Sequence, residues 1–238
     1  MKFLEILDDI ILSDKVVERF DSILENNIEF TLWLDSVIPE IRACGKQEQN
    51  NPWHKYDVLH HILHSVEEMN KQTEGMPLNE RRILAYTMLM HDIGKPAKHI
   101  TREKNGEMID SFFDHNIESE VVARRVLPKL NFSEDEINII AKLVYKHDIF
   151  MFIKDKPTRN PHWKVLTPAL IEHEIAELSQ VGDGEKLMKW LVMVGRSDNL
   201  AQNEKLTGEA LALLDKIDNI LSRRTSELKK KNINLISV

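Results

Sequence analysis

The sequence is poor in the residues that break helices or cross-link chains. Among its 238 residues are 8 glycines, 8 prolines and a single cysteine, Cys44. One cysteine excludes an internal disulfide and a cysteine-based zinc cluster, and it is typical of a reducing compartment. So few turn-forming residues over this length argue against a fold built from many short strands. The composition therefore favours helices.

Long apolar runs and an excess of positive charge are also missing. Every apolar stretch is far shorter than the roughly 20 residues that span a bilayer. Near the N-terminus, Glu5, Asp8 and Asp9 interrupt the apolar pattern, so it does not read as a secretory signal. The formal net charge is −7, whereas phosphate contacts need lysine and arginine. We expect a cytoplasmic protein without membrane contact or strong generic binding to nucleic acid.

The apolar residues recur mostly at helical spacing, which predicts an all-α protein. Residues 133–136 (SEDE) form a capping-box pattern at a helix start, and Thr167-Pro168 reads as an N-cap followed by the first helical residue. A long amphipathic helix is expected over 206–231. Residues 42–53 and 98–113 are expected to be loops, because no alternating strand pattern of useful length is present.

We predict a single domain over residues 1–238. Its parts are an N-terminal helical extension (1–49), a core (50–203) and a C-terminal helix (204–238).

Ten histidines are unevenly distributed, and several fall near the expected ends of helices. His91 and Asp92 lie in the last turn of one expected helix, just before Gly94. Asp198 lies in an apolar run, where a buried carboxylate is costly unless it is paired or binds a metal. Such residues on separate helices can converge on one point. Imidazole and carboxylate without thiolate suit a hydrolytic transition-metal centre. The alternative is a structural bundle with incidental histidines, because a lone buried histidine is usually a hydrogen-bonded core residue.

Three segments carry a resemblance to a known family: residues 57–61 (DVLHH), 89–96 (LMHDIGKP) and 197–202 (SDNLAQ). Together they resemble the HD superfamily of metal-dependent phosphohydrolases. The family pattern is a histidine, then a His-Asp pair, then a distant aspartate, and it falls here on His61, His91, Asp92 and Asp198. The resemblance implies an HD-domain helical bundle with additional N-terminal helices and a long C-terminal helix. His60 competes with His61 for the first position.

Two further segments, residues 112–115 (FFDH) and 143–148 (LVYKHD), are similar to the HD domain of bacterial CCA-adding tRNA nucleotidyltransferases. The match covers roughly residues 50–203. It implies one or two divalent ions (Mn, Fe, Ni, Co or Mg). With two ions, His115 and His147 complete a second position that Asp92 bridges. With one ion, the same two histidines contact the phosphate instead.

Residues around the expected metal site have expected roles as well, from the resemblance for Lys95 and from their positions in the sequence for the others. Asp92 and Lys95 are the expected catalytic residues, with Lys95 neutralising phosphate charge; its alternative role is a cation at a helix C-terminus. His54, Lys95 and Arg102 are expected to bind substrate, with plain surface placement as the alternative for Arg102. Asp57 and His64 share a helix face with His61, and either is a candidate to orient that ligand.

The implied activity is hydrolysis of a phosphate ester by a metal-activated water. The expected substrate is a small phosphorylated nucleotide or an RNA end. The expected enzyme is accordingly a phosphomonoesterase or a 2′,3′-cyclic phosphodiesterase. The alternative of a different class is a non-catalytic metal- or nucleotide-binding HD module associated with tRNA or RNA processing. The sequence leaves open whether the protein forms a homodimer.

Overall fold

The computed structural model describes residues 2–236, with side chains as far as Arg224. Over this part of the chain helices dominate, which confirms the all-α prediction. The α-helices are α1 (Lys2–Ile11), α2 (Val16–Asn26), α3 (Ile28–Val37), α4 (Glu40–Cys44), α5 (Val58–Gln72), α6 (Leu78–Met90), α7 (His115–Val126), α8 (Glu134–Lys146), α9 (Pro168–Leu178), α10 (Gly184–Leu200) and α11 (Gly208–Ile236). Residues 237–238 of the expected C-terminal helix lie outside the described part.

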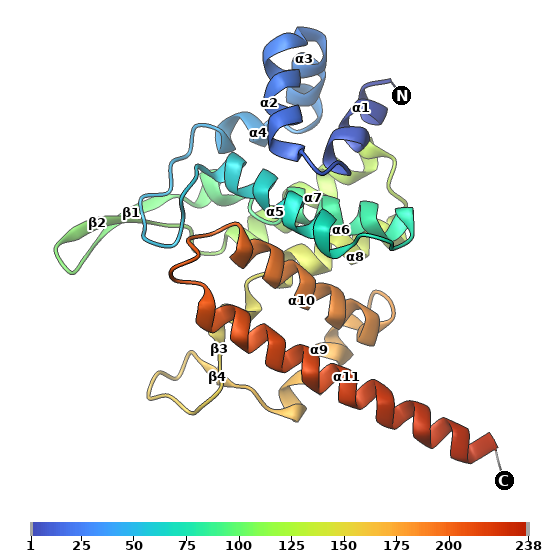
Figure 1. The fold of residues 1–238 in the computed structure, drawn as a ribbon. Coiled ribbons are helices and arrows are strands. Elements are labelled where there is room, and N and C mark those ends of the chain that lie inside the picture. Colours follow the sequence, from blue (N-terminus) through green and yellow to red (C-terminus); the bar gives the residue numbers. More distant parts are fainter. Residues whose placement is uncertain (1, 237–238) are drawn as a thin grey trace.

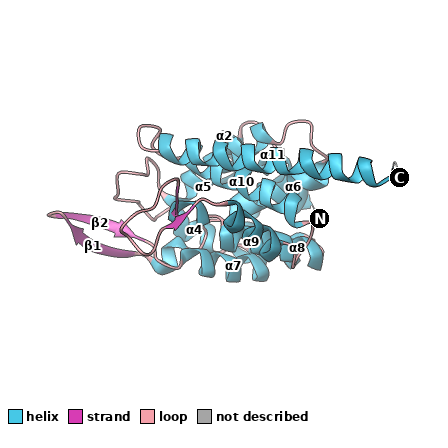
Figure 2. Ribbon diagram, turned by 90° about the horizontal axis from the view of Figure 1, so that it is seen from below, coloured by secondary structure: helices cyan, strands magenta, loops and turns pink. Residues whose placement is uncertain are grey.

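The helices are arranged around a central group formed by α5, α6, α7 and α8 (Figure 1). Within this group α5 packs on α6, α7 packs on α8, and α6 packs on α8. Helix α10 lies against α5 and α6 and carries α9 and α11 on its other side. Viewed from below, α11 runs along the body and extends beyond it at its C-terminal end (Figure 2). The central helices α5, α6, α7, α8 and α10 thereby meet in one region of the core.

The N-terminal helices α1–α4 form a separate layer on this core (Figure 1). A polar network ties α1 to α6: the hydroxyl of Tyr86 and Nε of Arg82 both donate to Oδ1 of Asp8, at 2.7 and 3.0 Å. The Arg82 guanidinium also lies 3.9 Å from the ring centroid of Phe132. Since these polar groups are largely shielded from water and satisfied by one another, they fix the extension against the core.

Two of the expected helix starts are confirmed. Ser133 accepts from the backbone N–H of Glu136 while the Glu136 carboxylate accepts from the backbone N–H of Ser133, which is the capping box. Thr167 accepts from the backbone N–H of Leu170, with Pro168 as the first residue of α9. Local side-chain hydrogen bonds therefore define where α8 and α9 begin.

The loop expected over residues 98–113 is wrong, because most of it is a β-hairpin. Strand β1 (Ile100–Lys104) pairs antiparallel with β2 (Glu107–Ser111) around Asn105 and Gly106, whose φ angles are 55° and 84°. Positive φ at both central residues is typical of a tight hairpin turn, for which Asn-Gly is the preferred pair. The strands show no apolar alternation because β1 is exposed throughout.

The remaining corrections are small. Helix α4 runs from Glu40 to Cys44 and so replaces the start of the loop expected over residues 42–53. A second, two-residue parallel pair joins β3 (Ile153–Lys154) to β4 (Lys164–Val165). Among the described helices, none combines the length and the apolar character needed to cross a bilayer.

Candidate metal centre

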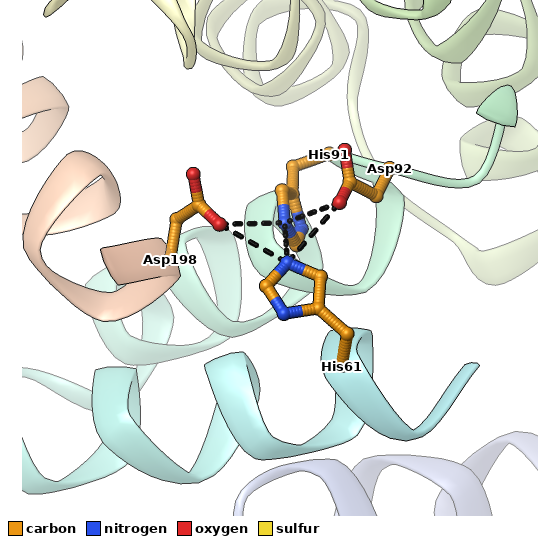
Figure 3. Close-up of side chains that lie close together, drawn as sticks. All are labelled: His61, His91, Asp92 and Asp198. Carbon is orange, nitrogen blue, oxygen red and sulfur yellow. Dashed lines mark hydrogen bonds and ion pairs between the residues drawn. The ribbon is translucent and has the colours of Figure 1, made fainter. Parts of the chain in front are cut away.

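Four buried side chains from three helical segments converge between α5, α6 and α10 (Figure 3). His61 comes from α5, His91 and Asp92 follow the last residue of α6, and Asp198 comes from the last turn of α10. Nε2 of His61 lies 3.1 Å from Oδ2 of Asp92 and 3.0 Å from Oδ1 of Asp198. Nε2 of His91 lies 3.4 Å from Oδ2 of Asp92. Two imidazoles and two carboxylates thus face a common point.

A second group adjoins the first and shares Asp92. Oδ1 of Asp92 lies 3.0 Å from Nε2 of His115, at the start of α7, and 3.5 Å from Nε2 of His147, which follows α8. The two oxygens of one carboxylate therefore face different sets of histidines. We call the group of His61, His91, Asp92 and Asp198 position A, and the group of Asp92, His115 and His147 position B.

The backbone determines which nitrogen these imidazoles present. Nδ1 of His91, His115 and His147 lies 2.6, 2.8 and 2.7 Å from the carbonyl oxygen three residues earlier in each case. A carbonyl can only accept, so each Nδ1 carries a proton, and in the neutral ring Nε2 is left as a lone pair pointing into the site. This is the arrangement in which metal-ligating histidines are usually held.

The resulting donor set fits a divalent cation. Nε2 of His91 and Nε2 of His61 are 3.4 Å apart, and those of His115 and His147 are 3.1 Å apart. Two imidazole lone pairs facing each other at such distances repel unless a proton or a cation lies between them. Imidazole and carboxylate without thiolate are the ligands of Zn, Fe, Mn, Ni and Co sites. Both positions are therefore chemically suited to a metal.

The site is also held together by the close approach of α7 to the segment after His91. A Cβ placed on Gly94 would lie 2.6 Å from the backbone nitrogen of Ser119 and 2.7 Å from the carbonyl oxygen of His115. The N–H of Gly94 donates to Oγ of Ser119 over 2.9 Å. Only glycine fits there, and this contact sets the distance between Asp92 and His115.

The charges of the site shift the pKa values of its members. Burial alone raises the pKa of Asp92, but the charges of Lys95 and His91 outweigh it and hold the pKa well below its ordinary value. Burial likewise lowers the pKa of His91, but Asp92 and Asp198 outweigh it and raise that pKa to about 10. The carboxylates are therefore ionised at neutral pH, and a proton on His91 compensates them when no metal does.

Lys95 lies inside this site rather than at an exposed helix end. Its ammonium is 2.6 Å from Oδ2 of Asp92, 2.9 Å from Oε1 of Gln49 and 3.4 Å from Nε2 of His54. The His54 ring also packs edge-on against His61, with centroids 5.0 Å apart. Burial and the Lys95 charge lower the pKa of His54 to about 2, so this ring stays neutral.

Arg102, the third residue expected to bind substrate, is not brought into the cluster. It lies on exposed strand β1, where Nε donates to Oγ of Ser111 over 2.8 Å and the guanidinium covers the ring of Phe113 at 4.9 Å. The structure thus places His54 and Lys95 beside position A and Arg102 on the hairpin.

The neighbours of His61 occupy other surroundings. His60 points away from the cluster and pairs with Asp57 over 2.7 Å, so His61 is the histidine that the structure brings to position A. Asp57 caps α5 by accepting from the backbone N–H of His60. His64 pairs with Glu67 at 3.3 Å. Neither Asp57 nor His64 orients the His61 ring, whose Nδ1 is buried without a hydrogen-bond partner among the described residues.

Two residues at the site were not anticipated from the sequence. Gln49 accepts from Lys95, and Gln202 donates from Nε2 to Oδ1 of Asp198 over 2.9 Å. Gln202 stands four residues after Asp198, a spacing at which helical side chains meet, so the pair was open to prediction. Gln49 lies in an irregular segment, and nothing in its sequence context marks it.

Comparisons with known proteins identify a family and several relatives. A family model described as HD domain matches residues 54–219. The chain is 26% identical over 167 residues to a bifunctional uridylyltransferase/uridylyl-removing enzyme of Ruegeria pomeroyi, covering 60% of this chain and 17% of that protein. Proteins of the same description from Cereibacter sphaeroides (26% over 127 residues; 48% of this chain, 12% of that protein) and Erythrobacter litoralis (24% over 157 residues; 60% and 15%) also match. The chain spans less than a fifth of the length of these relatives. The likeness to CCA-adding enzymes stays a prediction.

Proposed function

The chain belongs to the HD domain family, whose hydrolases depend on metal, and on this basis we propose that it is a phosphohydrolase that cleaves a nucleotide phosphate ester with a divalent ion held by His61, His91, Asp92 and Asp198. The observation that carries the proposal is the sharing of Asp92 between two histidine groups. One carboxylate with an oxygen in each position is what a bridging ligand between two ions requires. In this proposal position B takes a second ion.

A divalent ion at these positions supplies Lewis acidity toward a phosphoryl oxygen and makes water a stronger nucleophile at neutral pH. The protein's own residues orient and charge the site. Backbone carbonyls fix the rings of His91, His115 and His147, so no reorganisation is needed when substrate arrives. Asp92 is proposed to be the central catalytic residue, and Lys95 adds positive charge beside it.

The substrate reaches the site from the side where its ligands are least buried. The side chains of Asp198 and His115 are 10% and 13% exposed, whereas those of His61, His91 and His147 are 2% exposed or less. Exposure this limited suits a single phosphate group on a flexible ester better than a rigid duplex. We therefore propose a small nucleotide or a single-stranded end as substrate.

The descriptions of the relatives favour a phosphodiester over a phosphomonoester as the bond that is cleaved. They are described as uridylyl-removing, which for those proteins names removal of a uridylyl group. Such a reaction hydrolyses a phosphodiester. We propose phosphodiester hydrolysis, including that of 2′,3′-cyclic esters, ahead of phosphomonoester hydrolysis.

The test is to remove metal from the purified protein with a chelator and restore Mn²⁺, Fe²⁺, Ni²⁺, Co²⁺ or Mg²⁺ one at a time. Turnover of 2′,3′-cyclic nucleotides, uridylylated peptide and nucleoside monophosphates is then measured. We expect activity with at least one ion, and loss of it in Asp92→Asn and Asp198→Asn. Bound metal without turnover of any substrate would instead support the non-catalytic binding module.

A further inference from the structure

The ammonium of Lys95 is enclosed in an unusual way. It has three N–H donors and three acceptors around it: Oδ2 of Asp92 at 2.6 Å, Oε1 of Gln49 at 2.9 Å and Nε2 of His54 at 3.4 Å. Lys95 is 5% exposed. Its hydrogen-bonding capacity is therefore filled by the protein itself.

Gln49 presents a defined atom to this ammonium. Its Nε2 donates to the carbonyl oxygen of Tyr56 over 3.1 Å, which leaves Oε1 facing Lys95. The next residue, Asn50, is fixed by the hairpin: its N–H donates to Oδ2 of Asp110, and its carbonyl accepts from the N–H of Asp110. Gln49 is 6% exposed, so water does not compete for its amide.

We propose that Gln49 is a positioning residue that holds the Lys95 ammonium on Oδ2 of Asp92, and so fixes the plane of the carboxylate that both metal positions share. With the plane fixed, Oδ2 stays toward His61 and Oδ1 toward His115. The inference deepens the proposed function and rests on it.

Loss of the Gln49 carbonyl leaves one Lys95 donor without an acceptor in a buried place. The ammonium then moves toward water or substrate, and Asp92 rotates. Partners that orient metal ligands typically change metal affinity by roughly 10- to 100-fold. We expect Gln49→Met to weaken Mn²⁺ binding by about 10-fold, measured by calorimetric titration of the full chain. Gln49→Glu keeps an acceptor for Lys95 but loses the donor to the Tyr56 carbonyl, so it should weaken Mn²⁺ binding less than Gln49→Met does.

Two comparisons separate positioning from a general structural role. Gln47→Met is the matched control, because Gln47 lies on the same segment and, among the described residues, its side chain bonds only to the backbone of Glu48. A double-mutant cycle with Lys95→Met asks whether Gln49 acts through the lysine. In the Lys95→Met background, Gln49→Met should have no further effect on Mn²⁺ affinity.

The inference is overturned if Gln49→Met binds Mn²⁺ like the unaltered protein, or if its effect persists in full without Lys95. It is also overturned if Gln49→Glu binds as weakly as Gln49→Met. Should Gln49→Met fail to fold, Gln49→Ala removes the same carbonyl and is compared with Gln47→Ala instead. Because the readout is metal affinity, these results stand apart from the turnover that tests the proposed function.

Discussion

Replacing Gly94 by alanine should impair position B while leaving position A intact. The new Cβ would lie 2.6 Å from the nitrogen of Ser119, 2.7 Å from the carbonyl oxygen of His115 and 2.8 Å from Cβ of Glu118. Ordinary carbon contacts need roughly 3.4 Å or more, so the first turns of α7 must retreat by about 0.8 Å. His115 moves with them, away from Oδ1 of Asp92. Position A contains no residue of α7.

Gly94→Ala should have a small effect on the free energy of unfolding and a large effect on turnover. Overpacking of this kind costs about 1–3 kcal/mol of unfolding free energy. A displacement near 1 Å at a catalytic centre costs on the order of 100-fold in rate. We therefore expect Gly94→Ala to fold with a modestly lower melting temperature, to bind one equivalent of Mn²⁺ tightly, and to lose the second equivalent together with most turnover.

The assay is calorimetric titration with metal analysis of the dialysed protein, beside thermal unfolding. Gly208→Ala is the control, because a Cβ there meets nothing within 4 Å and the residue begins α11. If Gly94→Ala retained both Mn²⁺ equivalents at unaltered affinity, the reasoning that the α7 contact sets the geometry of position B would be refuted.

Three further outcomes are expected. His61→Ala should lower Mn²⁺ affinity by about 10-fold or more in the same titration, whereas His60→Ala should change it by less than about 2-fold; equal effects would contradict the placement of His61. In the metal-free protein the pKa of His91 is raised to about 10 from 6.5, so its contribution to stability is complete below pH 6.5 and is lost as pH rises toward 10. The melting temperature should fall over that window without metal and hold with saturating Mn²⁺, which binds the neutral ring; a fall of the same size with Mn²⁺ would argue against His91 as a ligand. Glu174→Gln should cost about 3 kcal/mol in urea unfolding, because Lys146, 2.6 Å away, is left as a buried unpaired charge; a loss below about 0.5 kcal/mol would show that Lys146 finds water.

The helical part of the fold was predictable because it is encoded locally. The capping box at Ser133 and the Thr167-Pro168 pair each mark a helix start through contacts within four residues. The sequence pattern does not reveal the hairpin, because β1 is exposed throughout, β2 is partly exposed, and neither strand carries apolar alternation. Its local signal is the Asn105-Gly106 pair, which favours a tight hairpin turn even where the flanking strands lack apolar periodicity.

Likewise, some residues of the candidate site follow from a sequence pattern and others do not. The family pattern in the sequence led to His61, His91, Asp92 and Asp198, and the structure brings these residues to one point. Gln49 could not be found in this way, since its partner Lys95 lies 46 residues away and an irregular segment carries it. Contacts that depend on the path of a loop have no periodic signature, and a glutamine has no chemistry that marks it in advance.

The charges of the site favour an anionic substrate independently of the family. Without metal, the two carboxylates of position A are balanced by the ammonium of Lys95 and a proton on His91. His61, His91, Asp92 and Asp198 would hold a divalent ion in place of that proton, and the buried group would then carry a net positive charge. A second ion at position B, where only the shared carboxylate is negative, increases the excess further. Uncompensated charge is costly away from water, so the loaded site stabilises a bound anion, and a phosphate ester supplies both the charge and the oxygens that such ions prefer.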